Sequence, residues 1–160
     1  MKIRQGKADD LQAVVKIAEA AWERIYAGYK EQIGEELFNG FYSNWKKNKV
    51  SEIRDSVMSG NWRLYVTEKD GEIVAFITIM INKEERTGVI GNNAVHPKYQ
   101  GLGLGTKQYN YVLDVMKNEG VLYVKVFTGG DDAHAPARRA YEKAGFSVKI
   151  PSVTYYMKLK

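Results

Sequence analysis

Three alternating glycines near the middle of the chain form the pattern with the clearest chemical meaning. They are Gly101, Gly103 and Gly105. A strand-like stretch ends just before them, and an amphipathic segment begins among them at Leu102. Glycine adopts the positive φ angles of tight turns. Such a turn at the start of a helix leaves backbone N–H groups free, where the helix dipole also favours negative charge. The spacing therefore predicts a binding site for a phosphate or pyrophosphate group.

Two common nucleotide-binding motifs do not fit this turn. The dinucleotide motif G-x-G-x-x-G places its third glycine one residue later than Gly105, and no acidic residue closes a following strand to bind a ribose. The P-loop motif places a lysine and then a hydroxyl residue after its last glycine. Here Gly105 is followed by Thr106 and only then by Lys107. We therefore reject both motifs.

Two segments, the first of which contains this turn, together resemble a known family. Residues 95–105 read VHPKYQGLGLG and resemble the cofactor-binding motif Q/R-x-x-G-x-G/A of the GNAT superfamily of acyl-CoA-dependent N-acyltransferases. Residues 137–146 read ARRAYEKAGF and are similar to that family's helix and following strand. The two motifs occur in the family's order, separated by one helix and one strand. The resemblance covers residues 89–146, and the N-terminal half matches only in the order of its elements.

The resemblance implies acetyl-CoA as the co-substrate, and no metal. It also implies that backbone N–H groups of the turn bind the pyrophosphate, and that the end of the preceding strand lends main-chain groups to the pantetheine and the acetyl oxygen. The residues expected to contact the cofactor are Ala94, Val95, His96, Gln100, Gly101, Leu102, Gly103, Leu104, Gly105, Thr106, His134, Ala137 and Tyr141. His134 stands where the family often has asparagine, so a purely structural role at the start of a helix stays open.

The same resemblance implies direct transfer of the acetyl group to an amine. Tyr141 matches the tyrosine that protonates the coenzyme A sulfur, and a phenol with a pKa near ~10 keeps its proton at neutral pH. The family often carries a glutamate as general base on the strand where this chain has residues 91–93, Gly-Asn-Asn. A water chain or another group must then act, and the candidates are Glu23, Asp131, Asp132 and His134.

In the family the first two helices shape the acceptor site, and here they are rich in aromatic residues. These are Trp22, Tyr26, Tyr29, Phe38, Phe41, Tyr42 and Trp45, with Glu19, Glu23, Glu31 and Glu35 available to attract a cation. We expect a small amine or a peptide N-terminus as the acceptor. Two alternatives remain, namely an acyl-CoA-binding sensor without turnover and a nucleotide-binding regulatory module.

Composition limits the other possibilities. The chain has 160 residues, 44% hydrophobic and 27% charged, which fits one N-acetyltransferase domain over residues 1–160. Without cysteine there is no disulfide or thiolate nucleophile, and two histidines make a histidine-rich metal site implausible. The net charge of +5 is scattered, which indicates solvated surfaces and not a nucleic-acid site. No signal peptide or membrane span is evident, so we expect a cytoplasmic protein, and a homodimer stays open.

The periodicity of apolar residues predicts the elements that position these groups. Strands are expected at residues 2–6, 63–68, 73–81, 87–95, 121–128, 146–150 and 153–159, with a hairpin turn at Asp70-Gly71. Helices are expected from residue 11, over 32–48 and 50–58, and then over 102–118 and 135–144. This order predicts an α/β (α+β) fold with a mixed, mostly antiparallel sheet of about seven strands, flanked by helices.

Overall fold

The computed structural model describes residues 1–160 and contains one five-stranded sheet in the order β1-β2-β3-β4-β5. The strands are β1 Lys2–Gln5, β2 Arg63–Lys69, β3 Glu72–Asn82, β4 Thr87–Val95 and β5 Tyr123–Val126. The first four are antiparallel to their neighbours, whereas β5 pairs with β4 in parallel. The mixed, mostly antiparallel sheet is thus confirmed.

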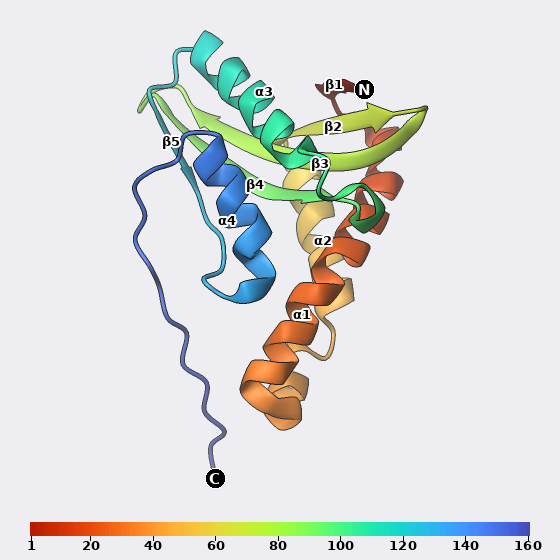
Figure 1. Ribbon diagram of the computed structural model, residues 1–160, viewed down its shortest axis with the longest axis vertical. Coiled ribbons are helices and arrows are strands. Elements are labelled where there is room, and N and C mark those ends of the chain that lie inside the picture. The colour runs from red at the N-terminus through yellow and green to blue at the C-terminus, as the bar shows by residue number, and fades with distance from the viewer.

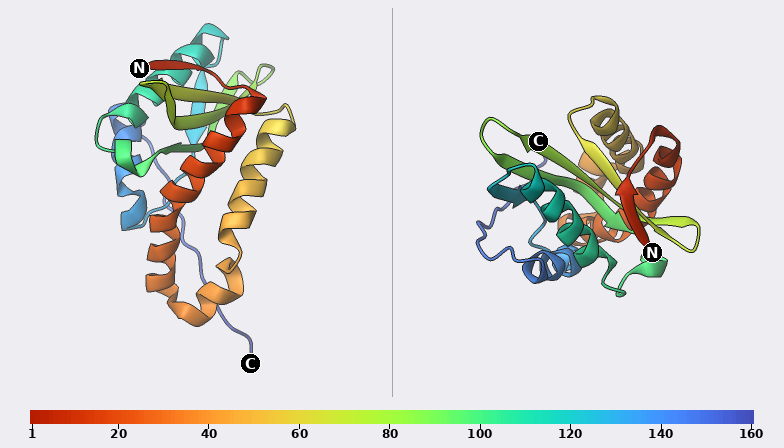
Figure 2. Two further views of the ribbon diagram at one scale, coloured as in Figure 1. Left: turned by 90° about the vertical axis from the view of Figure 1, so that its right-hand side faces the viewer. Right: turned by 90° about the horizontal axis from the view of Figure 1, so that it is seen from above.

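Helices cover both faces of this sheet (Figures 1 and 2). On one face lie α1 (Leu11–Tyr42) and α2 (Trp45–Met58), and on the other lie α3 (Leu104–Asn118) and α4 (Ala135–Lys143). Short 3-10 turns precede α1, α3 and α4 at residues 8–10, 97–99 and 132–134. None of the helices is both long enough and apolar enough to cross a lipid bilayer.

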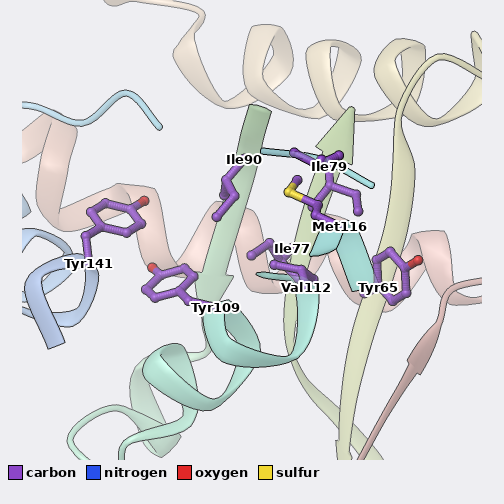
Figure 3. Packing of buried hydrophobic residues seen from close by; sticks show 9 residues of the cluster. Tyr65, Ile77, Ile79, Ile90, Tyr109, Val112, Met116 and Tyr141 are labelled. Atoms are coloured by element: carbon purple, nitrogen blue, oxygen red, sulfur yellow. The ribbon is translucent and has the colours of Figure 1, made fainter. Parts of the chain in front are cut away.

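The core forms two clusters because side chains alternate across a strand. Tyr65, Ile77 and Ile79 point toward α3 and α4, where they meet Val112 and Met116 (Figure 3). Leu64, Val66 and Phe76 point the other way, toward apolar residues of α1 and α2. Strand β3 contributes to both clusters, which explains its nearly continuous apolar sequence.

The predicted hairpin between β2 and β3 is confirmed. Asp70 and Gly71 both have positive φ angles, of 53° and 84°. This pair of left-handed residues gives a two-residue loop whose twist matches that of the strands it joins.

The first helical region differs from the expectation. In the structure α1 ends at Tyr42 and α2 begins at Trp45. The break between the two helices therefore falls inside the predicted piece 32–48, and the predicted piece 50–58 is part of α2. Within α1 the path bends at Gly34, whose φ of 81° and ψ of 163° are not helical. A glycine tolerates that conformation, so the helical pattern resumes after the kink.

The two last predicted strands, at 146–150 and 153–159, are wrong. Residues 146–160 adopt no regular structure and extend away from β5 and α4 toward the far end of α1 (Figure 1). The sheet therefore has five strands and not about seven. Alternation predicts a strand correctly only where a partner strand is available, and these residues lie beside none.

Candidate active site

The glycine turn joins β4 to α3, as predicted, and two of its glycines are required by backbone geometry. Gly101 and Gly103 have φ angles of 79° and 72°. Gly105 already lies inside α3, and a Cβ there would meet Tyr109 and Ala140 only at ordinary contact distances of 3.9–4.0 Å. An alanine therefore fits at position 105 but not at 103, which explains the G/A alternative in the motif.

This turn presents a run of free backbone donors. After Gln100, the first backbone N–H group that has an acceptor in the chain is that of Lys107, which donates to the Gly103 carbonyl at 3.1 Å. The N–H groups of Gly101 to Thr106 have no acceptor within the chain. Leu104 is buried and anchors the helix start, whereas Leu102 is exposed. An anion such as a pyrophosphate would satisfy these donors, as the sequence predicted.

The preceding strand is held in place from the turn. The Gln100 side chain donates from Nε2 to the Val95 carbonyl at 3.0 Å, and the His96 Nδ1 accepts from the Lys98 N–H at 3.2 Å. Both motif residues thus stabilise the turn itself. Their contact with a cofactor stays a prediction, as it does for Ala94 and Thr106.

Beyond Ile90 strand β4 separates from β5. The two strands pair only from Thr87 to Ile90, and the register between β3 and β4 shifts between Ile77 and Ile79. The shift leaves two residues of β4, Gly91 and Asn92, opposite one residue of β3, Thr78, which is a β-bulge. Residues 91–95 therefore have no strand partner on the β5 side, and their edge is open to a ligand.

Gly91 allows this bulge because no side chain fits there. A Cβ at Gly91 would lie 2.4 Å from the Trp62 ring and 2.7 Å from the Thr78 hydroxyl. The Thr78 hydroxyl also donates to the Asn92 carbonyl at 3.1 Å, which fixes the bulged strand. Packing thus excludes a carboxylate at position 91 itself.

Asn93 lies at the centre of a buried hydrogen-bond network that sequence analysis missed. Its Oδ1 accepts from the Tyr109 hydroxyl at 2.8 Å, and its Nδ2 donates to the Tyr141 hydroxyl oxygen at 3.1 Å. The centroids of the two phenol rings lie 4.6 Å apart, and the rings lie side by side next to β4 (Figure 3). Its three residues lie on β4, α3 and α4, which are distant in the sequence. The only signal of the network in the sequence is therefore one tyrosine on each of the two amphipathic helices.

Burial and the hydrogen bonds of this network both shift the pKa of Tyr141. Its ring is only 6% exposed, and this burial raises the pKa of Tyr141 above the ordinary value of 10.0, although hydrogen bonds from Asn93 and Tyr109 partly lower it. Burial also raises the pKa of Tyr109. The Tyr141 hydroxyl donates to Asn93 Oδ1 over 3.4 Å, a longer bond than the 2.8 Å bond that this oxygen accepts from Tyr109. A closer acceptor would therefore compete well for the Tyr141 proton.

His134 is engaged locally. Its Nδ1 lies 2.6 Å from Asp131 Oδ2, and the Asp131 side chain also accepts the His134 backbone N–H. Burial acts to raise the pKa of Asp131, but the hydrogen bonds from His134 outweigh it, so the pKa is lowered. Arg138 holds the same loop by donating to the carbonyls of Gly129 and Asp131. The contact between His134 and Asp131 gives His134 a structural role at the start of α4. Cofactor contact by His134 stays a prediction.

A carboxylate outside the predicted set contacts the bulge from the opposite face. Glu52 of α2 accepts a hydrogen bond from Asn92 Nδ2 at 2.9 Å and pairs with Lys49 at 2.7 Å. Lys49 lies over the Trp22 ring, with its nitrogen 4.9 Å from the ring centroid. By contrast, the predicted candidate Glu23 is exposed and pairs with Lys46.

The predicted aromatic residues of the first two helices do gather. Tyr26 stacks on Trp45 with centroids 4.3 Å apart and meets the edge of Tyr29 at 5.5 Å. Tyr29 in turn lies 6.3 Å from the His134 ring, so the cluster reaches the loop before α4. Burial and nearby Asp131 raise the pKa of Tyr29 to about 12. Trp22 is the exception, because it packs on Phe76 in the core.

Comparison with known proteins agrees with this architecture. The sequence model described as the acetyltransferase (GNAT) family matches residues 22–146. A mycothiol acetyltransferase of Sanguibacter keddieii is 34% identical over 87 residues, which are 51% of this chain and 27% of that protein. The chain thus matches only about a quarter of that relative's length.

Solved structures resemble the whole fold. A variant of the BH1408 protein of Bacillus halodurans superposes with a TM-score of 0.72 at 16% identity, covering 99% of this chain and 100% of that chain. The PaiA N-acetyltransferase of Thermoplasma acidophilum, solved in complex with coenzyme A, gives a TM-score of 0.66 at 23% identity, covering 93% and 92% of the two chains.

Proposed function

This chain belongs to the acetyltransferase (GNAT) family, and from that premise we propose that it transfers an acetyl group from acetyl-CoA to a primary amine. The acceptor class we propose is a small amine or a peptide N-terminus. The observation that carries the proposal is the open edge of β4 beyond Ile90, lying between a turn of free N–H groups and the protonated Tyr141.

The residues around this edge fit the cofactor. The free N–H groups of Gly101 to Thr106 match a pyrophosphate, and the edge of β4 at residues 91–95, which pairs with β3 but not with β5, matches the amides of a pantetheine arm. When bound, acetyl-CoA supplies an activated acetyl thioester. Backbone N–H groups of β4 aimed at the thioester oxygen would stabilise the negative charge that develops there.

Tyr141 is proposed as the general acid. It holds a proton at Oη throughout the neutral range, since burial raises its pKa. Asn93 orients the hydroxyl by donating to its oxygen, and the long 3.4 Å hydrogen bond from the hydroxyl to Asn93 Oδ1 would give way to a departing thiolate, which takes the proton.

Glu52 is proposed as the general base, acting through a water molecule. It is the carboxylate bound to the bulge at Asn92, on the face of the sheet that α1 and α2 cover. Glu52 would act in place of the glutamate that the family often has on this strand, because position 91 has no room for a side chain. We expect Glu52→Gln to lower kcat. Asp55→Asn, one turn further along α2, serves as the control and should leave kcat unchanged.

The function is tested by thiol release from acetyl-CoA with a panel of amines and peptides. Turnover with any amine supports the transferase. Binding of coenzyme A in a thermal-shift assay without any turnover would favour the acyl-CoA sensor instead, as the lack of a strand glutamate suggests. Stabilisation by NAD or ATP, but not by coenzyme A, would overturn the proposal.

A further inference from the structure

The ammonium group of Lys49 lies in a well-defined site beside the β4 bulge. It is 2.7 Å from Glu52 Oε2 and 3.3 Å from Asn92 Oδ1. The Trp22 ring covers a third side, with the nitrogen 4.9 Å from the ring centroid. A carboxylate, an amide oxygen and an aromatic face are all groups that bind an alkylammonium ion. The site therefore has the chemistry of an amine-binding site, and a lysine of the chain itself fills it.

Contacts outside the site hold its walls in place. Trp22 stacks on Phe76 of the core, with ring centroids 6.5 Å apart. Asn92 Nδ2 donates to Glu52 Oε1 at 2.9 Å, so one carboxylate binds both the bulge and the ammonium. The sheet and the core thus position the groups around the ammonium, and the Lys49 side chain does not have to hold them.

Lys49 differs from the other lysines that form ion pairs. Its side chain is 11% exposed, whereas those of Lys46 and Lys30 are 54% and 47% exposed. Lys46 lies one turn earlier on α2 and also lies over an aromatic ring, that of Trp45, but it pairs with exposed Glu23 of α1. Of the lysines in ion pairs, only Lys49 also bonds to β4.

We propose that Lys49 is itself an acetyl acceptor, so that the enzyme acetylates this side chain when no other amine fills the site. The inference rests on the proposed function, in which the thioester lies along residues 91–95 of β4 and Glu52 acts as the base. Lys49 bonds both to that base and to Asn92 within those residues. A tethered amine beside the reacting group reacts as though it were present at a very high concentration.

The transfer balances with acetyl-CoA as the only other reactant. Glu52 takes one proton from the Lys49 ammonium, and the neutral Nζ attacks the thioester carbon. A C–N bond forms, the C–S bond breaks, and Tyr141 gives its proton to the departing sulfur. A second proton leaves the nitrogen and is returned to Tyr141 through solvent, while the third stays on the amide. The products are Nε-acetyl-lysine, free coenzyme A and the proton held by Glu52.

Peptide mass mapping of the full-length chain, incubated with acetyl-CoA and no added amine, tests the modification. We expect the initial rate of acetylation at Lys49 to exceed that at exposed Lys47 by about tenfold or more. Lys47→Arg is the matched control and should leave the rate at Lys49 unchanged, whereas Tyr141→Phe and Glu52→Gln should lower it to the rate at Lys47. Equal rates at the two lysines in the native chain, as in a chain unfolded in urea, would overturn the proposal.

The dependence on protein concentration shows whether the amine is tethered. Transfer within one chain is first-order, with a rate constant that does not change with chain concentration. A rate constant proportional to chain concentration would show transfer between chains and would overturn the proposal. Thiol release with an added amine while Lys49 stays unmodified would overturn this inference and leave the proposed acetyltransferase function intact. Acetylation of neither amine would overturn both.

The amine site is also tested without acetyl-CoA. Lys49→Ala removes the ammonium and leaves Glu52, Asn92 and Trp22 in place. We expect millimolar propylamine to raise the unfolding temperature of this variant more than that of the native chain, in which Lys49 fills the site. Lys49→Ala/Glu52→Gln lacks the carboxylate and should show no such excess. Equal stabilisation of all three chains would overturn the amine site.

Discussion

The Asn93 amide nitrogen lies 3.1 Å from the Tyr141 hydroxyl oxygen and links the β4 strand to the α4 helix across the separation of β4 from β5. The same side chain accepts from Tyr109 of α3. One amide thus connects three elements at the point where the sheet opens. This arrangement allows the chemistry and the stability of the site to be tested separately.

Tyr141→Phe removes the proposed proton donor and keeps the ring. We expect kcat to fall about 10²–10⁴-fold where the chemical step limits turnover. Tyr111→Phe is the matched control, because Tyr111 packs on Tyr65 away from Asn93, and it should keep full activity. Unchanged turnover by the Tyr141 variant would exclude it as the acid.

Asn93→Ala leaves two buried phenol hydroxyls without their partner. We expect a loss of about 1–3 kcal/mol in the free energy of unfolding, measured with urea. Asn110→Ala, on the exposed side of α3, should stay within about 0.5 kcal/mol of the native protein. In combination with Tyr109→Phe the effects should be non-additive, because the two groups share one hydrogen bond. Simple additivity would argue against the network.

The glycine turn predicts a difference between two substitutions. Gly103→Ala forces a Cβ into the left-handed region and should destabilise the chain by about 1–2 kcal/mol. Gly105→Ala fits inside α3 and should be neutral or slightly stabilising in the cofactor-free protein. Thermal unfolding of both variants measures the difference, and an equal loss in both would contradict the assigned geometry.

Gly91→Ala tests the bulge. The new methyl group would meet Trp62 and Thr78, so we expect about 1–3 kcal/mol of destabilisation from overpacking. Gly130→Ala has open space and an ordinary φ, and it should change little. Chemical denaturation of both variants gives the comparison. A neutral Gly91→Ala would show that the strand can shift to admit a side chain.

Acid should weaken the N-terminal ion pair. The hydrogen bonds from Arg4 are the main reason that the pKa of buried Asp10 lies below 3.8 in the folded chain. The folded state therefore gains stability from ionised Asp10 above pH 3.8, and it loses that gain as the pH falls through the lower folded pKa. Asp10→Asn should remove about 1.5–3 kcal/mol at pH 7 and flatten the acid dependence of the unfolding free energy. Exposed Asp9→Asn should leave that dependence in place.

Local patterns in the sequence determined most of the elements and the glycine turn between β4 and α3. Strand β4 begins and ends where its apolar pattern does, and the Asp70-Gly71 hairpin and the Gly101–Gly105 turn follow from residues that tolerate positive φ. These features depend on neighbours within a few positions. Their physical cause is therefore contained in the local sequence.

Only the tertiary structure decided which side chains meet. The Asn93–Tyr109–Tyr141 network joins residues up to 48 positions apart, and Glu52 reaches Asn92 across 40 positions. No periodicity encodes such contacts, because each residue alone fits an ordinary core or surface position. The pattern of residues 146–159 likewise specified a strand, but a strand forms only against a free edge. Where that edge lies is a property of the folded sheet.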